Sequence, residues 1–545
     1  MNNYIEKIFL ELVGIKSDTG TSLERNIEEY LYNWFENNDY FIKNKENFGL
    51  YKLNNDHLKR SIVWGLVKGS GNDTVVLIHH HDVVNELDYG KLSKYAYSPF
   101  ELMKTIKEYK LPNEIEKELG SGEWIFGRGT ADMKAGASIQ LYLIDKYSKL
   151  NAFKGNLLII SVPDEECLSA GMREAIYLLN ELNEKFNLNY KLLINSEPHQ
   201  REKENEGVIY EGSVGKIMPI VYVRGKQTHV GDIFEGFNPV SLLSSIVRRT
   251  ELNTGFSDVM DEEITPPPSW TYFRDNKKFY DVSIPRSACG YFSILNLYTS
   301  PYEIINKIKK ICEESFEEVL DNMNENYNKY LNRINKKSKK LPWRVNVKTF
   351  DELYNQAKSE YKDAFINDYK KTMDNIKINI KDKKINMQEA SFILIEKTLE
   401  YIKDISPIVI IGLSPPYYPN VCNRDFNDLS NTIKYLSDRI NEYSAKNWNE
   451  NYKKKNYFMG ISDMSYTFLN NHEEVKKAIG PNMPLWDEVY SIYFEGIKKL
   501  SIPVVNIGPW GKDIHKFTER VYKKDLLERT PKLIDYAIQI VLDMI

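Results

Sequence analysis

The stretch Thr74-Val-Val-Leu-Ile78 predicts a short buried strand, and His79-His80-His81-Asp82 follows it directly. Three of the chain's eight histidines lie in this stretch, and such a concentration suggests that at least one of them has a function. Because alternate side chains of an extended strand share a face, His80 and Asp82 should point one way and the two flanking histidines the other. A carboxylate beside an imidazole is the usual means of orienting a histidine that binds a metal through its other nitrogen. The stretch therefore predicts that a metal ligand, His80, lies at the end of a strand.

Four further stretches place acids or a histidine beside a predicted strand or turn. They are Gly127-Arg-Gly-Thr-Ala-Asp132, Val162-Pro-Asp-Glu-Glu166, Leu193-Ile-Asn-Ser-Glu197 and Ile507-Gly-Pro-Trp-Gly-Lys-Asp-Ile-His515. In open parallel sheets ligands gather at the carboxyl ends of the strands, so these groups should converge on one crevice. Two imidazoles and three carboxylates suit a pair of zinc ions, roughly 3.5–4 Å apart, that share one bridging carboxylate. Glu165 is then left as a free base. Each motif alone is weak; the ordered set is specific.

The composition excludes several classes of partner. Of 545 residues 42% are hydrophobic and 28% charged, so a large core and two or more domains are expected. Acidic and basic residues nearly cancel, 77 against 73, and no dense basic stripe occurs, so neither nucleic acid nor an anionic membrane surface is an expected partner. No apolar run reaches the ~18 residues of a membrane span. With four scattered cysteines and no secretion signal, a reduced, cytoplasmic protein is expected.

The pattern up to residue 212 is that of an α/β domain. Strands are predicted at 61–67, 74–78, 156–162 and 191–194, and helices at 135–147 and 170–182. Strands that alternate with helices imply a mostly parallel sheet covered on both faces. We expect residues 1–212 to form the first part of a discontinuous catalytic domain and residues 387–545 to complete it.

Two segments are expected to interrupt this domain. A strand at 215–224, a helix at 239–250, a strand at 288–298 and a helix at 301–325 predict an inserted α+β lid or dimerisation domain over residues 213–350. Residues 351–386 are charged and rich in Tyr and Lys, and predict a solvated helical insertion. The catalytic domain should then resume with a helix at 387–402, a strand at 407–413, a helix at 426–443 and a strand at 503–507.

Taken in order, the motifs resemble those of the dinuclear zinc aminoacylases and exopeptidases, such as acetylornithine deacetylase, succinyl-diaminopimelate desuccinylase and glutamate carboxypeptidase. The matching stretches are the H-x-D of 80–82, the G-R-G-T-A-D-M-K of 127–134, the D-E-E of 164–166, the S-E-P of 196–198 and the histidine at 515. The triple histidine and the G-P-W-G-K-D-I-H-K ending are most similar to the arginine-utilisation branch of Gram-positive bacteria. The resemblance implies a catalytic domain with the zinc-exopeptidase fold.

The resemblance also implies a role for each matching residue. Asp132 would bridge two divalent metal ions. His80 and Glu197 would complete the first site, and Glu166 and His515 the second. Zinc is the expected metal, while cobalt and manganese stay open. The peptide bond after Asp132 would be cis.

Three residues would act in catalysis. Asp82 would orient His80, and Glu165 would be the general base that takes a proton from water and passes it to the leaving nitrogen. His229, in Val223-Arg-Gly-Lys-Gln-Thr-His229, resembles the family's lid histidine, which reaches the active site of a partner subunit and hydrogen-bonds the developing oxyanion. The alternative for His229 is a surface histidine on a turn. A homodimer is therefore expected, with a self-sufficient monomer as the alternative.

The chain departs from the family pattern in the residues that would bind the substrate. A charged insertion occupies 101–121, and no arginine follows Asp463 to hold a substrate carboxylate. Arg224, Arg286 and Arg424 are the remaining candidates for that role, and each is also typical of an ordinary surface residue.

The predicted reaction is hydrolysis of the amide bond in an N-acyl amino acid or a short peptide, with a link to arginine catabolism from the branch resemblance. One alternative is an aminopeptidase-type exopeptidase on the same metal site. The other is a non-catalytic metal-containing protein that binds an amino-acid metabolite.

Overall fold

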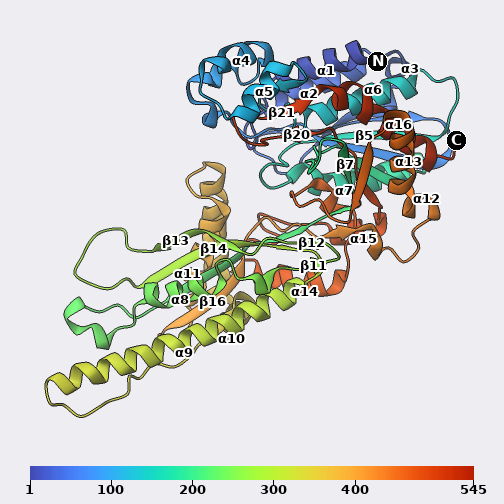
Figure 1. The fold of residues 1–545 in the computed structure, drawn as a ribbon. Helices are drawn as coiled ribbons and strands as arrows, with labels where there is room; N and C mark the ends of the chain where they lie inside the picture. The colour runs from blue at the N-terminus through green and yellow to red at the C-terminus, as the bar shows by residue number, and fades with distance from the viewer. The chain divides into compact units, whose positions relative to one another are not determined.

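The structure is a computed structural model that describes residues 1–545, and the chain folds into two compact units (Figure 1). The first unit comprises Met1–Val214, Pro419–Asn470 and Tyr493–Ile545, and the second comprises Gly215–Tyr418 and Asn471–Ile492. None of the helices combines the length and apolar character that a membrane span needs.

The first unit is built on an eight-stranded sheet in the order β1-β2-β5-β3-β6-β19-β7-β18. The strands are β1 (Phe48–Lys52), β2 (Ser61–Lys68), β3 (Ser70–His80), β5 (Lys154–Val162), β6 (Asn189–Asn195), β7 (Glu206–Tyr210), β18 (Asn451–Lys455) and β19 (Val504–Asn506). At its centre β3 pairs in parallel with β5 and β6, and β6 with β19, while β1 and β2 are antiparallel. The sheet is mostly parallel, as the sequence predicts.

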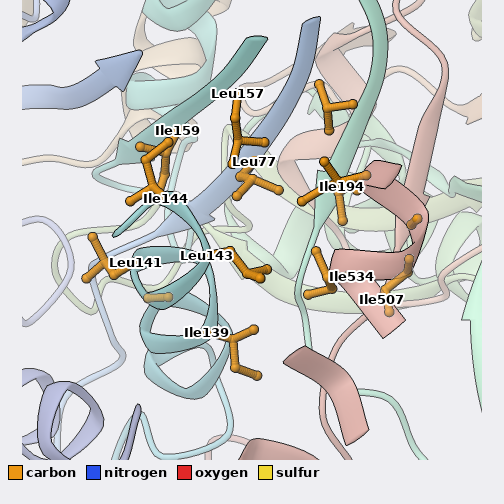
Figure 2. Close-up of a cluster of buried hydrophobic side chains, with 14 of the residues drawn as sticks. Leu77, Ile139, Leu141, Leu143, Ile144, Leu157, Ile159, Ile194, Ile507 and Ile534 are labelled. Carbon is orange, nitrogen blue, oxygen red and sulfur yellow. The ribbon is translucent and has the colours of Figure 1, made fainter. Parts of the chain in front are cut away.

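Helices cover both faces of this sheet. On one face α1 (Asn2–Gly14), α6 (Lys134–Ser148) and α16 (Thr530–Val541) share an apolar core with Leu77 of β3 and Leu157 of β5. Figure 2 shows side chains of α6 and Ile534 of α16 beside these strand residues. The alternate strand residues point to the opposite face, where α7 (Ala170–Phe186) contacts β2 and β5 and packs against α15 (Phe494–Leu500). The core therefore fixes the strands whose carboxyl ends carry the predicted ligands.

The first unit has further short elements. They are α2 (Glu24–Glu36), α3 (Asp39–Lys43), α4 (Pro99–Thr105), α5 (Asn113–Ser121), α12 (Asn431–Lys434), α13 (Leu436–Trp448), a small sheet of β4 (Trp124–Phe126), β20 (Gly511–Lys512) and β21 (Arg520–Tyr522), and the pair β8 (Gly212–Ser213) and β17 (Val421–Cys422). The predicted insertion at 101–121 is mostly helical and packs its own apolar cluster against β4.

The second unit has a sheet in the order β13-β14-β10-β16-β15, with β9 pairing β14. Its strands are β9 (Gly215–Ile217), β10 (Pro219–Arg224), β13 (Ser269–Asp275), β14 (Ser287–Asn296), β15 (Val347–Thr349) and β16 (Ile408–Leu413), with a separate hairpin of β11 (Val259–Met260) and β12 (Glu263–Ile264). Its helices are α8 (Pro239–Thr250), α9 (Pro301–Arg333), α10 (Phe350–Lys381), α11 (Met387–Leu399) and α14 (His472–Asn482). Capping boxes begin α9, α10 and α11, which explains why these helices start where the sequence changes pattern.

The structure differs from the expected division of the chain after residue 350. The segment 351–386 is helical, but it is not simply a solvated excursion, because Leu353, Ala357 and Phe365 of α10 are buried in a core with α11. β16 pairs with β10, so α11 and β16 belong to the second unit, whereas the sequence assigns 387–418 to the catalytic domain.

One predicted helix is also wrong at its start. The sequence predicts a single helix over 426–443, whereas the chain forms α12 and α13. The reason is local, because the side chain of Ser430 caps α12 by accepting the N–H of Ile433.

Candidate metal centre

All five predicted metal ligands belong to the first unit, and the structure brings them together. His80 ends β3, Glu166 follows β5 and Glu197 follows β6. Asp132 lies between β4 and α6, and His515 lies in the loop after β20. Parallel strands that end at the same edge of a sheet account for the meeting of residues from distant parts of the chain.

Asp132 stands between the two histidines. Its Oδ1 lies 2.9 Å from Nε2 of His80, and its Oδ2 lies 3.3 Å from Nε2 of His515. Glu197 Oε1 is 3.4 Å from the same nitrogen of His80, and Glu166 Oε1 is 3.0 Å from that of His515. Two donors bound to one tetrahedral ion at about 2.0–2.1 Å lie about 3.3 Å apart, so these separations fit shared ions. The cluster divides into two groups joined by Asp132.

The electrostatics of the cluster also fit cations. Burial and the neighbouring Asp132 raise the pKa of Glu197 to about 8, and the same causes raise the pKa of Glu166. Burial lowers the pKa of His515, but its contacts with Asp132 and Glu166 outweigh this and raise it to about 11. A buried group of repelling carboxylates is stabilised by positive charge, so this donor set suits divalent metal ions.

Asp82 contacts the ring of His80 and also the backbone of the Asp-Glu-Glu turn. The imidazole Nδ1 of His80 donates to the backbone oxygen of Asp82 at 3.0 Å, while the Asp82 carboxylate is 3.6 Å from that nitrogen. The carboxylate instead accepts the backbone N–H groups of Glu165 and Glu166, at 3.1 and 3.2 Å. Asp82 therefore connects the end of β3 to the Asp-Glu-Glu turn.

Glu165 lies beside the cluster in a position that suits a base. Its carboxylate, the imidazole of His80 and the carboxylate of Glu197 offer donor atoms that all lie within 4.8 Å of one another. Glu165 is 8% exposed, and its pKa is raised by burial and by the nearby Asp463. Such a group accepts a proton readily, and the Gly-Ile-Ser-Asp loop that carries Asp463 is thereby part of the site.

The other two histidines of the triplet bond elsewhere. His79 Nδ1 is 2.9 Å from Oε1 of Gln140, and His81 Nδ1 is 2.9 Å from Oγ of Ser161. Burial lowers the pKa of His79 to about 4 and that of His81 to about 3, so both rings are neutral. They support the strand end, and only His80 faces the ligand cluster.

Sequence reasoning missed the pair that supports Asp132. Glu519 Oε1 accepts the backbone N–H groups of Ala131 and Asp132, at 3.1 and 3.2 Å, and its Oε2 accepts from Arg128 at 2.8 Å. Arg128 also donates to the backbone oxygen of His515 at 3.4 Å. The Gly-Arg-Gly-Thr motif shows Arg128, but nothing local to the sequence indicates its partner.

A second missed feature is a close approach of two loops. A Cβ atom on Gly508 would collide with the backbone carbonyl of Glu197, and one on Gly136 would collide with that of Ser196. Only glycine allows the backbones to lie this close, so both positions help to set Glu197.

His229 belongs to the second unit, at the exposed start of a short 3-10 helix (Val230–Glu235). Its Nδ1 accepts the N–H of Gly231 at 3.0 Å, so the neutral ring carries its proton on Nε2. Its predicted part in catalysis stays a prediction. The peptide between Asp132 and Met133 is cis, as the resemblance implies.

Comparisons with known proteins agree with this geometry. Residues 104–530 match the peptidase family M20/M25/M40. The chain is 33% identical over 540 residues to the uncharacterized protein YqjN of Bacillus subtilis (strain 168), covering 98% of this chain and 96% of YqjN. It is 28% identical over 535 residues to protein RocB of the same organism, covering 97% of this chain and 93% of RocB.

A solved structure shares the fold. Bacillus subtilis YxeP, described as a dinuclear metal-binding peptidase of the M20 family, aligns with a TM-score of 0.52 at 10% identity, covering 100% of this chain and 99% of YxeP. The matched family covers most of the chain, and His80, Asp132, Glu165, Glu166 and Glu197 form groups whose donor atoms could hold metal ions. The chain therefore belongs to peptidase family M20/M25/M40 and is a metal-dependent hydrolase of amide bonds.

Proposed function

We propose that the chain holds two zinc ions and hydrolyses the amide bond of an N-acyl amino acid or a short peptide. The observation that carries this proposal is the carboxylate of Asp132, whose two oxygens face two different imidazoles. His80 and Glu197 complete one donor set, and Glu166 and His515 complete the other.

The protein residues then have distinct tasks. When bound, the ions would polarise the substrate carbonyl and lower the pKa of water to about 7. Glu165 takes the proton of the attacking water and delivers it to the leaving nitrogen, for which its buried position and raised pKa are suited. Asp82 keeps the backbone of Glu165 and the ring of His80 in register.

His229 is the proposed donor to the developing oxyanion. Its Nδ1 is occupied by the N–H of Gly231, which leaves an Nε2–H free to donate. We place this histidine in the active site of a partner subunit, so the active form is a homodimer.

The substrate class follows from the sequence resemblance to the arginine-utilisation branch, supported by the 28% identity to RocB. We therefore place the substrate among acylated amino acids and short peptides linked to arginine use, and the enzyme in the cytoplasm.

The test is a metal measurement joined to a hydrolysis screen. Zinc-loaded protein should contain two ions per chain. It should hydrolyse N-acyl amino acids faster than peptides with a free amino terminus. Faster hydrolysis of the peptides would instead indicate an aminopeptidase. Glu165→Gln should keep both ions and lose about 10²–10⁴ in kcat. The control is Glu29→Gln, a change at an exposed glutamate, which should keep both the ions and the wild-type kcat. Full turnover in Glu165→Gln would refute the assignment of the base.

The dimer proposal has its own experiment. Glu165→Gln and His229→Ala should each be inactive alone, while a mixture that exchanges subunits should recover about a quarter of the wild-type activity, because half of the dimers are mixed and each has one intact site. Persistent inactivity of the exchanged mixture would show that His229 does not act across subunits.

A further inference from the structure

A cavity of about 450 Å³ lies within the second unit, where three cationic side chains meet an apolar wall. The cations are Arg224, Lys226 and Arg286, and the wall is formed by Leu399, Ile402 and Ile405. None of these residues belongs to the unit that holds the metal ligands.

Two adjacent strand ends bring the arginines together. Arg224 is the last residue of β10, and Arg286 directly precedes β14, which pairs with β10 in antiparallel register. The N–H of Gly225 donates to the backbone oxygen of Arg286 at 2.9 Å, which fixes this corner. Lys226 lies on the same turn, with its Nζ 5.0 Å from the centre of the Trp343 ring.

The cations have no carboxylate partner in this structure. Arg224 is only 8% exposed, yet its Nη2 donates to two backbone oxygens, those of Asp404 at 2.5 Å and Ser406 at 2.9 Å, and its Nε has no partner. Burial lowers the pKa of Arg224, and the nearby charge of Asp404 offsets this only in part. The sequence expectation of an ordinary surface arginine is wrong for this residue.

The acids near the cavity are already engaged. Glu400 pairs with Lys397 at 2.7 Å. Asp404 accepts the N–H of Ser406 at 2.9 Å and lies 3.4 Å from Arg344. The C-terminal end of α11 adds a partial negative charge of about one half, which three full cations outweigh. The cavity therefore has an excess of positive charge.

We propose that this cavity binds a small organic oxyanion, with its head on Arg224, Arg286 and Lys226 and its apolar body against Leu399, Ile402 and Ile405. A guanidinium matches either a carboxylate or a phosphate through paired N–H donors. The apolar wall selects a ligand with a hydrocarbon portion over a bare inorganic ion.

The test is calorimetric titration of the zinc-loaded protein with three probes: inorganic phosphate, acetate and hexanoate. Hexanoate should bind saturably, with a Kd of about 1 mM or below. Each added methylene that reaches the wall should tighten binding by about two- to four-fold, so hexanoate should exceed acetate. Tighter binding of phosphate than of hexanoate would overturn the role of the apolar wall, and no saturable binding of any probe would overturn the site.

Matched variants separate this site from general charge effects. Arg286→Gln and Lys226→Gln change exposed side chains and should each weaken hexanoate binding by at least about ten-fold, the value of losing one charge-assisted contact. Arg248→Gln removes the same charge elsewhere on this unit, where Arg248 pairs with Glu318, and should bind as wild type does. Equal weakening in all three variants would contradict a built site.

Discussion

Arg128 and Glu519, 391 residues apart, form an ion pair at 2.8 Å in which both side chains are 1% exposed. The pair joins the turn before Asp132 to the loop of His515. Two ligands of the candidate metal centre are thus held by one buried interaction.

Glu519→Gln should therefore destabilise the first unit. The oxygen of the introduced amide can still accept the backbone N–H groups of Ala131 and Asp132. The charge of Arg128 then has only the partly exposed Asp88 as an acidic partner, which should lower the free energy of unfolding by about 3 kcal/mol. Thermal unfolding of the metal-free protein should shift down by about 5 °C. Adding Arg128→Met to the same variant should recover much of this loss, because the unpaired charge is then gone. An unchanged unfolding temperature in the single variant would contradict this account.

The metal content of ligand variants should follow the two donor groups. His515→Ala should retain one ion per chain, because the group of His80 and Glu197 is intact. Asp132→Asn should hold fewer than one, since it weakens both groups. Elemental analysis after dialysis measures this, with His57→Ala, an exposed histidine, as the control that keeps two ions. Equal metal content in His515→Ala and wild type would exclude His515 as a ligand.

Asp82→Asn should impair catalysis without unfolding the protein. An amide has one acceptor oxygen, whereas the carboxylate accepts two backbone N–H groups from Glu165 and Glu166. We expect about a 10–100-fold loss in kcat/KM or in metal affinity. Steady-state kinetics at saturating zinc separate the two effects, and Asp39→Asn, an exposed aspartate, is the control. Wild-type values for both quantities would show that the turn does not depend on Asp82.

The buried Glu28 should make stability depend on pH. It is 4% exposed and accepts the N–H of Ser61 at 2.9 Å, and burial raises its pKa to about 7 from 4.5. The folded state holds this proton more tightly than the unfolded state. Stability from this group is therefore complete below pH 4.5 and falls as the pH rises to about 7.

Glu28→Gln removes this titration while keeping a hydrogen-bond acceptor. The variant should be more stable than wild type at pH 8, by up to about 3 kcal/mol, with a much smaller difference at pH 5. Urea unfolding at the two pH values measures this, and the exposed neighbour variant Glu29→Gln should show no such change. A constant difference between pH 5 and pH 8 would show that Glu28 does not titrate in this range.

The candidate ligands could be predicted from sequence because each lies beside a local signal. His80 follows an apolar run, and Asp132 follows a glycine-rich turn. The partner of Arg128 could not be predicted, since no local pattern reports a contact 391 residues away. The same limit applies to β16, whose apolar run predicts a strand but not that it pairs with β10.

The burial of one face of α10 could not be predicted from the sequence for a different reason. Its charged residues dominate the composition of 351–386, while the buried side chains of Leu353, Ala357 and Phe365 are spaced by four and eight residues among them. A narrow apolar stripe in a charged helix resembles a solvated segment when only composition is considered.

The strand order has a consequence for synthesis of the chain on the ribosome. β19 lies between β6 and β7, yet it is made about 300 residues after them. At about 5–20 residues per second, β6 waits roughly 15–60 s with an open hydrogen-bonding edge. A product that ends before residue 504 would lack β19 and leave the edges of β6 and β7 unpaired, so closure of the central sheet depends on roughly the last forty residues of the chain.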